Sequence, residues 1–425
     1  MSADQHSLEG SKLLIVEPKL IKNRGHHHTQ IAALRALLPD HQLHFIAGVG
    51  YDGFLGEAAA TLTAADQVKA RQYWRFRHGG FRQKVDAFFR SVSDGGIGSY
   101  PKSPFGHTIL EVCERLEFDA HDTLIIPSAN LDALESIVDF VSQLDKNTPQ
   151  ISMRLLDPTL GEHKDSRRAQ RMKLFRDAIR KSEKIRLFSE TRELAEYMWK
   201  QFDLPVTSGF YLTCSVSPLE PTPKAAGFYD TFRVGLLGAP RPGKGYDRVG
   251  AIVEELSSLI DSRSLDQPVE ILLQGSGTDY VDGGVYSFAK HFESKADKLR
   301  VTCFSDSLDP EVFEELFLST DVILLPYDTG VYGLQGSGLV QDAVAAEKII
   351  VHSKGIAMQD FLAHGNAIPV IGNREFSEAI VSAFEQKNRF RRGCRAAKEY
   401  FGQILKSHPF LGEADLSNSP VSIEK

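Results

Sequence analysis

One stretch, TFRVGLLGAPRPGKGYDR from Thr231 to Arg248, constrains the fold of this chain most strongly. It begins with a mostly apolar run, Phe232 to Leu237, of the kind that forms a buried strand. A loop rich in glycine and proline follows, and apolar residues then recur at helical spacing as far as Ile260. The sequence therefore predicts a strand, a loop and a helix in succession, which is the repeating unit of open α/β sheets.

The loop of this unit carries two cations, Arg241 and Lys244. Such a loop lies where α/β sheets bind ligands, and a helix N-terminus attracts anions, so the two cations and the backbone N–H groups suit a diphosphate. Gly238, Gly243 and Lys244 also match most of a Walker A pattern. Gly245 follows, however, where that pattern needs a hydroxyl residue to hold Mg²⁺, which disfavours a nucleoside triphosphatase.

The letters GAPRPGKGYDR closely resemble the donor-binding loop of the GT-B glycosyltransferases of family 4, which are of the retaining type. The resemblance implies an α/β protein of GT-B fold, with two Rossmann-like domains facing a central cleft. It also implies that Arg241 and Lys244 contact the diphosphate of a nucleotide sugar and stabilise its charge as it departs. Gly238 and Gly243 belong to the same donor site. The alternative is a solvated basic turn.

A second glycine-rich loop follows the predicted strand Val322–Pro326 and precedes a predicted helix. Members of the resembling family have a glycine-rich loop at this place. Gly336, Ser337 and Gly338 would let the backbone approach phosphate oxygens closely, with the helix dipole adding attraction. These three residues are therefore expected to bind the donor.

The resembling family often carries two glutamates, eight positions apart, across this loop and helix. The second of them holds the ribose of the nucleotide and falls at Asp342, for which a solvated acid on a helix surface is the alternative. The first contacts the transferred sugar, yet no acid stands at Leu334 or Gln335. Asp328 could supply a carboxylate from the same loop. This departure leaves the identity of the sugar open, and transfer itself in doubt.

Two further donor-site candidates, Gly275 and Ser305, follow other predicted strands of the second half of the chain. In the resembling family, the loop at Ser305 holds the nucleobase. Strands and helices alternate throughout this half, which predicts a parallel sheet. Its predicted strands are Phe232–Leu237, Glu270–Gln274, Arg300–Phe304, Val322–Pro326, Ile349–His352 and Ala367–Ile371.

The first half also opens with a strand, a turn and a helix, and three consecutive histidines, His26 to His28, lie near the start of that helix. Neighbouring residues of a helix point about 100° apart, so these histidines cannot together hold one metal ion. His27 is a candidate base or ligand for a sugar hydroxyl; helix-capping or solvated histidines are the alternative. The predicted strands are Lys12–Val16, His44–Ala47, Asp122–Pro127, Gln150–Leu156 and Ile185–Phe188.

The length of 425 residues exceeds that of one ordinary domain, and a proline-rich stretch without periodicity, Ser215–Gly227, suits a linker. We therefore expect an acceptor-binding domain over 1–214, a linker over 215–228 and a nucleotide-sugar-binding domain over 229–395. The resemblance implies that the remainder, 396–425, is a helix that crosses back to the first domain and a flexible tail.

The composition of the chain limits which classes of partner and cofactor are expected. The net charge of −7 shows no global basicity, so nucleic acid is not an expected partner. Four scattered cysteines, a polar N-terminus and the lack of a long apolar run favour a cytoplasmic protein without a metal site or other cofactor. Two basic stretches, 68–90 and 164–186, could contact an anionic membrane at its inner face, or could be ordinary amphipathic surface helices.

These inferences together predict a hexosyltransferase. It would move a hexose from a nucleotide sugar to a saccharide or lipid-linked saccharide acceptor, with retention, in polysaccharide or glycoconjugate biosynthesis. The cations of the donor loop would make a metal unnecessary. Two alternatives remain: a sugar-nucleotide epimerase of the same fold, and a nucleotide-sugar-binding protein without transferase activity.

Overall fold

The computed structural model divides into two compact units, 1–210 and 211–425, which are described separately. The predicted linker lies within the second unit as far as it is described. The structure describes residues 11–22, 26–39, 41–62, 81–82, 84–85, 104–141, 148–180, 182–212, 215–222, 230–238, 240, 243–263, 265, 267–275, 298–305 and 308–407.

The first unit is built on a parallel sheet of seven strands in the order β3-β2-β1-β4-β5-β6-β7. Its first strand, β1, pairs with β2 on one side and with β4 on the other. The strands β2 and β3 therefore extend the sheet on one side of β1 and the strands β4 to β7 on the other, so the strand order reverses beside β1. The strands are β1 (Lys12–Val16), β2 (Gln42–Gly48), β3 (Ala60–Leu62), β4 (Thr123–Ala129), β5 (Gln150–Leu155), β6 (Ile185–Ser189) and β7 (Thr207–Ser208).

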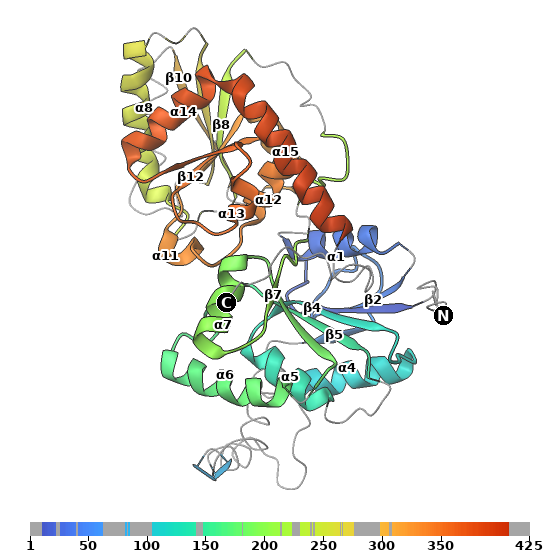
Figure 1. The fold of residues 1–425 in the computed structure, drawn as a ribbon. Coiled ribbons are helices and arrows are strands. Elements are labelled where there is room, and N and C mark those ends of the chain that lie inside the picture. Colours follow the sequence, from blue (N-terminus) through green and yellow to red (C-terminus); the bar gives the residue numbers. More distant parts are fainter. Residues whose placement is uncertain are drawn as a thin grey trace, which may run out of the picture. The chain divides into compact units, whose positions relative to one another are not determined.

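Helices cover both faces of this sheet, with α4, α5 and α6 in a row along one face and α1 on the other (Figure 1). Because both faces are covered, the strands are continuous apolar runs rather than alternating ones, and the last four residues of β1, Leu13 to Val16, have no exposed surface. The helices are α1 (His26–Leu37), α4 (Pro104–Arg115), α5 (Leu131–Val141), α6 (Asp165–Ile179) and α7 (Arg192–Phe202).

The second unit contains a parallel sheet of six strands in the order β10-β9-β8-β11-β12-β13. Here the reversal lies beside β8, which pairs with β9 on one side and with β11 on the other. The strands are β8 (Phe232–Leu236), β9 (Val269–Gln274), β10 (Leu299–Phe304), β11 (Val322–Leu325), β12 (Ile349–Ser353) and β13 (Ala367–Val370).

Helices α8 and α14 pack together over this second sheet and form much of its core (Figure 1). Apolar residues at helical spacing in α8, among them Ile252, Val253 and Leu256, meet the strand residues Val234 and Leu236. The helices are η1 (Tyr246–Arg248, one 3₁₀ turn), α8 (Val249–Arg263), α10 (Pro310–Ser319), α11 (Thr329–Tyr332), α12 (Gly338–Ala345), α13 (Gln359–Leu362), α14 (Asn373–Glu385) and α15 (Lys387–Lys406).

Every strand predicted from the sequence is present, with ends that differ by at most two residues. Two strands were not predicted, β3 and β7, because they have three and two residues and too little periodicity to detect. The last helix begins at Lys387, earlier than expected, and residues 408–425 lie outside the described part of the chain. No described helix combines the length and the hydrophobicity that a membrane-spanning segment requires.

Candidate functional site

The second unit offers a ligand-binding edge where strands β8 and β11 end side by side. Parallel α/β sheets bind ligands beyond the carboxyl ends of their strands, at the point where strand order reverses. The loop after β8 carries the predicted Gly238, Gly243 and Lys244, and the loop after β11 leads into α12. The two glycine-rich loops identified in the sequence therefore leave the sheet at adjacent strand ends.

Lys244 and Gly238 come together at this edge. A Cβ atom placed on Gly238 would lie 2.8 Å from Nζ of Lys244 and 3.0 Å from Cδ1 of Leu339, the second residue of α12. The ammonium group thus lies against the glycine backbone, close to the first turn of the helix. Gly238 has a φ of 90°, and its N–H donates to Oε1 of Gln274 at 2.6 Å. Any larger residue at this position would displace the lysine.

The loop that presents Lys244 is packed tightly against the end of β11. Gly245 has a φ of 72°, and a Cβ atom there would lie 1.9 Å from the carbonyl oxygen of Pro326. The carbonyl of Gly243 accepts a hydrogen bond from the N–H of Asp328 at 2.7 Å. The first of these contacts requires glycine, and together they tie the loop to the strand end. Lys244 therefore extends from a constrained backbone.

The predicted residues Gly336, Ser337 and Gly338 lie at this edge, where helix α12 begins at Gly338. Ser337 is the N-cap residue and its side chain makes no capping hydrogen bond. Its hydroxyl instead lies 3.3 Å from Oη of Tyr327. All three positions are partly exposed, and the N–H of Ser337 donates to Sδ of Met358 at 3.1 Å. Their binding of the donor stays a prediction.

The surroundings of Asp342 do not fit the ribose ligand expected from the sequence. Its side chain is buried in α12, and its Oδ1 accepts hydrogen bonds from the N–H groups of Ser215 at 2.7 Å and Val216 at 2.9 Å. Burial raises the pKa of Asp342 to about 7, although the two amide donors act in the opposite direction. A buried carboxylate that already accepts from two amides has a structural role, and we do not include it in the donor site.

The remaining predicted donor residues are distributed along the same edge. Gly275 follows β9, with its N–H donating to the carbonyl of Phe304 at 2.9 Å. Ser305 follows β10 and is exposed. Arg241, predicted to bind the diphosphate with Lys244, lies outside the described residues. Gln274, which holds the Gly238 backbone, was not predicted, since a glutamine ending a strand carries no recognisable signal.

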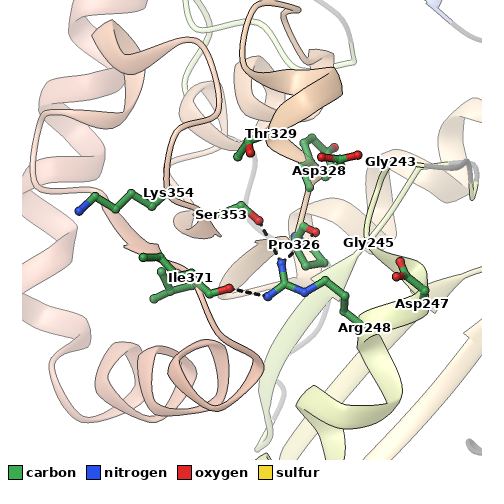
Figure 2. Close-up of a pocket in the computed structure, with 12 residues that line it drawn as sticks. Gly243, Gly245, Asp247, Arg248, Pro326, Asp328, Thr329, Ser353, Lys354 and Ile371 are labelled. Atoms are coloured by element: carbon green, nitrogen blue, oxygen red, sulfur yellow. Dashed lines mark hydrogen bonds between the residues drawn. The ribbon is translucent and has the colours of Figure 1, made fainter.

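A cavity of about 410 Å³ opens beside the Lys244 loop, at the ends of β11, β12 and β13 (Figure 2). Gly243 and Gly245 contribute to its wall. Arg248 binds two other segments of the wall, donating to the Ile371 carbonyl at 2.7 Å, to Oδ1 of Asn373 at 2.9 Å and to the Ser353 hydroxyl at 3.3 Å. Burial lowers the pKa of Arg248.

Charged groups of both signs surround the mouth of this cavity. Asp247, Asp328 and Lys354 line it, and all three are exposed. In Figure 2, the Lys354 side chain extends away from Arg248. Sequence analysis did not single out Arg248, because its partners Ser353 and Asn373 lie more than a hundred residues from it in the chain. It did not single out Lys354 either.

In the first unit, His27 lies at the carboxyl end of β1. Its Nδ1 is 3.5 Å from Oε2 of Glu17, the residue that directly follows the strand. Glu17 is almost completely buried, whereas His27 is partly exposed. The prediction singled out His27 but not its carboxylate partner. A glutamate after an apolar strand would have been the signal.

The basic stretch 164–186 is less uniformly basic in three dimensions than in sequence. Arg171 is buried, and its guanidinium contacts Oδ1 of Asp132 at 2.5 Å and Oε1 of Glu135 at 2.7 Å. Arg168 pairs with Asp165 at 2.6 Å. The other basic stretch, 68–90, lies almost entirely outside the described residues. Contact with an anionic membrane stays a prediction. So does independence from metals, although the described residues contain no cluster of His, Cys, Asp or Glu suited to a metal ion.

Comparison with known proteins found solved structures only. No protein-family model matches the chain, and no curated protein matches it. A glycosyltransferase from Rickettsia africae is 13% identical with a TM-score of 0.59, over 96% of this chain and 100% of that one. A UDP-forming α,α-trehalose-phosphate synthase from Burkholderia xenovorans is 10% identical with a TM-score of 0.57, over 93% and 95%. Anabaena HepE, solved in complex with UDP, is 12% identical with a TM-score of 0.57, over 93% and 97%.

These likenesses extend over both units, and at such identities they establish the fold. The chain has the GT-B fold, with one Rossmann-like sheet in each unit. The fold expected from the donor-loop resemblance is therefore confirmed.

Proposed function

We propose that this chain is a glycosyltransferase that moves a hexose from a nucleotide sugar to a saccharide or lipid-linked saccharide acceptor. The observation that carries the proposal is the position of the Lys244 ammonium, against Gly238 and beside the first turn of α12. An ammonium group and a helix N-terminus both favour an anion at one place. The diphosphate of a nucleotide sugar has the matching charge, and the fold is shared with UDP-bound HepE.

In this proposal, Lys244 and Arg241 bind the diphosphate and stabilise the charge that grows on it as the bond to the sugar breaks. Because the Lys244 loop is tied to β11 through Gly243 and Gly245, the ammonium is positioned before the reaction and needs little reorganisation. The backbone at Gly338 adds attraction through the start of the helix. These groups supply the charge for which other transferases use a metal ion.

Retention of the anomeric configuration and transfer of a hexose rest on the resemblance of the donor loop. The configuration is measured directly from the coupling constant of the anomeric proton in the product, by nuclear magnetic resonance. A product with the donor's configuration supports retention, and the opposite configuration excludes it.

A specific observation favours a second candidate, a binding protein that keeps the nucleotide site without transfer. No acid stands at Leu334 or Gln335, where the resembling family places the glutamate that contacts the sugar. The N-cap residue of α11, Asp328, is the exposed carboxylate of the same loop. If transfer occurs, Asp328→Asn is the first substitution with which to ask whether that carboxylate has taken over the contact.

The two candidates are separated in two steps. First, thermal unfolding is followed with UDP-, GDP- and ADP-linked sugars, because a ligand that binds the folded state raises the unfolding temperature. Second, release of nucleoside diphosphate is measured alone and with a panel of saccharides. A transferase releases diphosphate slowly alone and faster with its acceptor, whereas a binding protein shows stabilisation without release. Absence of stabilisation by every nucleotide sugar would overturn both.

A further inference from the structure

The cavity at the ends of β11, β12 and β13 lies on the other side of the Lys244 loop from the proposed diphosphate site. The Lys244 ammonium group lies near Gly238 and Leu339, and none of these three residues lines the cavity. The residues on either side of the lysine, Gly243 and Gly245, do line it. The loop therefore separates two places in the second unit, and the cavity has no part in the proposed binding of the diphosphate.

The wall of this cavity is fixed by Arg248, the last residue of η1. Its guanidinium group donates to the Ile371 carbonyl, to Oδ1 of Asn373 and to the Ser353 hydroxyl, and Figure 2 draws the first and third of these bonds. The guanidinium carbon also lies 4.8 Å from the centroid of the Phe376 ring. These contacts tie η1 to the ends of β12 and β13, so the cavity is formed before a ligand binds.

Polar side chains around the cavity remain available to a ligand. The Asp247 carboxylate, the Thr329 hydroxyl and the Lys354 ammonium group are exposed, and they make no hydrogen bond or ion pair with any residue that the structure describes. In Figure 2, Lys354 lies on one side of the cavity and Asp247 on the other, with Thr329 between them. Hydrogen-bond donors and acceptors without a protein partner thus surround one hollow.

Apolar surface borders the same cavity. Ile371 lines it and is 67% exposed. Val331 is 42% exposed and lies beside Gly243, where a Cβ atom would be 3.2 Å from Cγ2 of the valine. These are two of the four large apolar side chains that are exposed among the described residues of the second unit. Apolar groups combined with a few polar ones are typical of pockets for small ligands.

The charges around the cavity indicate a neutral ligand with many hydroxyl groups. A ligand with one net charge would be attracted by either Asp247 or Lys354 and repelled by the other. A hydroxyl group donates to a carboxylate and accepts from an ammonium group, and such charge-assisted bonds are stronger than those between neutral groups. The C–H face of a sugar ring suits Ile371. The volume of about 410 Å³ lies in the range of small-molecule pockets.

We propose that this cavity is a second saccharide-binding site, separate from the site for the nucleotide sugar. Asp247, Thr329 and Lys354 bind the hydroxyl groups of a neutral saccharide, and Ile371 packs against its ring. The site requires no transfer, and a protein that only bound nucleotide sugars would have it as well.

The test follows the Ile371 methyl signal in the full chain, with ¹³C-labelled isoleucine methyl groups. The signal is assigned by its loss in Ile371→Val. Glucose, galactose, mannose, N-acetylglucosamine, maltose and cellobiose are added in turn, with glycine and inorganic phosphate as charged probes. We expect at least one saccharide to shift the signal until it saturates. No saturable shift with any saccharide, or a shift with the charged probes alone, would overturn the proposal.

Two substitutions show whether the charged groups bind the saccharide. Asp247→Asn removes one charge-assisted hydrogen bond, so we expect the dissociation constant of the saccharide to rise about tenfold. Lys354→Ala should act in the same direction. The matched control is Asp261→Asn on α8, because it also removes an exposed aspartate charge and does not line the cavity. Equal dissociation constants in Asp247→Asn and Asp261→Asn, at unchanged unfolding temperatures, would contradict the proposal.

The outcome can be distinguished from failure of the proposed function. Lys244→Ala should bind the saccharide as wild type does, because Lys244 lies outside the cavity. Saccharide binding at Ile371 without binding of any nucleotide sugar would overturn the proposed function alone. Nucleotide-sugar binding without a saccharide shift at Ile371 would overturn this proposal alone.

Discussion

Lys244 and Asp342 of the second unit both align with ligand-binding positions of the resembling family, but their side chains differ in burial. Lys244 is partly exposed, and its ammonium group lies against the Gly238 backbone. Asp342 is enclosed and accepts hydrogen bonds from two backbone amides. Burial therefore distinguishes the two residues, because it decides which charge is available to a ligand.

Replacing Lys244 with alanine should remove a preorganised partner of the departing diphosphate. We expect kcat/KM to fall about 100-fold or more, with an unchanged unfolding temperature, because a partly exposed loop cation contributes little to the core. Arg241→Ala should act in the same direction. Lys200→Ala, which removes an exposed lysine from α7, is the control. Wild-type turnover in Lys244→Ala would show that the diphosphate lies elsewhere.

The raised pKa of Asp342 predicts a dependence of stability on pH. The folded state keeps its proton up to about pH 7, whereas the unfolded chain releases it near pH 3.8, so the free energy of unfolding falls as pH rises between these values. Asp342→Asn removes this ionisation and keeps an oxygen for the amides of Ser215 and Val216. Relative to wild type, the variant should therefore gain stability from pH 4.5 to pH 8, by ~4 kcal/mol at most.

Urea unfolding at pH 4.5, 6 and 8 measures this difference. A gap between wild type and Asp342→Asn that stays constant across the three pH values would contradict the assignment of a buried, raised-pKa carboxylate. Binding of UDP should be unchanged in the variant, and a large loss of affinity would restore the ribose role that the structure disfavours.

The loop between β8 and η1 packs against the end of β11, and this contact constrains its conformation. Its conformation is set by positive φ angles and by contact with the end of β11, and it places Lys244 beside α12. Gly245 carries both constraints, since a side chain there would be strained and would also collide with the Pro326 carbonyl. The position of the Lys244 ammonium group is thus determined by the packing of the loop after β8 against the loop after β11.

Gly245→Ala should therefore lower the free energy of unfolding by more than backbone strain alone would. Gly53 has a similar φ of 84°, but a Cβ atom added there would meet no atom within 4 Å, so Gly53→Ala measures the strain without the collision. We expect Gly53→Ala to lower the free energy of unfolding by ~1 kcal/mol and Gly245→Ala to lower it by more, with a parallel loss of UDP affinity. Equal costs in chemical denaturation would show that the loop yields freely at Pro326.

Helix α6 is the described element on which the membrane hypothesis can be tested. Because Arg171 is buried by Asp132 and Glu135, only exposed cations such as Arg167 and Lys173 can meet a membrane. We expect vesicles with anionic lipid to bind the chain at low salt and release it at high salt, and Arg167→Glu with Lys173→Glu to weaken this binding. Cosedimentation that is absent for anionic and neutral vesicles alike would remove the hypothesis.

On the scale of the whole molecule, the two units repeat one arrangement. Each has a parallel sheet whose strand order reverses beside its first strand, and each gathers polar groups at the carboxyl edge near that reversal. In the second unit these groups include Lys244 and Arg248, and in the first they include Glu17 and His27.

Transfer should persist in excess EDTA, because the proposed charge partners of the diphosphate are the side chains Arg241 and Lys244 rather than a bound ion. The measurement is product formation after dialysis against the chelator, compared with the same sample after addition of Mg²⁺ or Mn²⁺. Activity that disappears with EDTA and returns with either ion would contradict a metal-independent mechanism.

Except for the short strands β3 and β7, the sequence was enough to predict the strands, the two glycine-rich loops and the αβ alternation, because these depend on local periodicity and on residues close in the chain. It also placed Lys244 on a loop before a helix. Tertiary structure decided which groups meet. Asp342 is matched with Ser215 and Val216, and Arg248 with Ser353, only through packing of segments far apart in the chain. Burial raises the free energy of a charged group, and it results from that packing, so no short stretch of sequence reveals it.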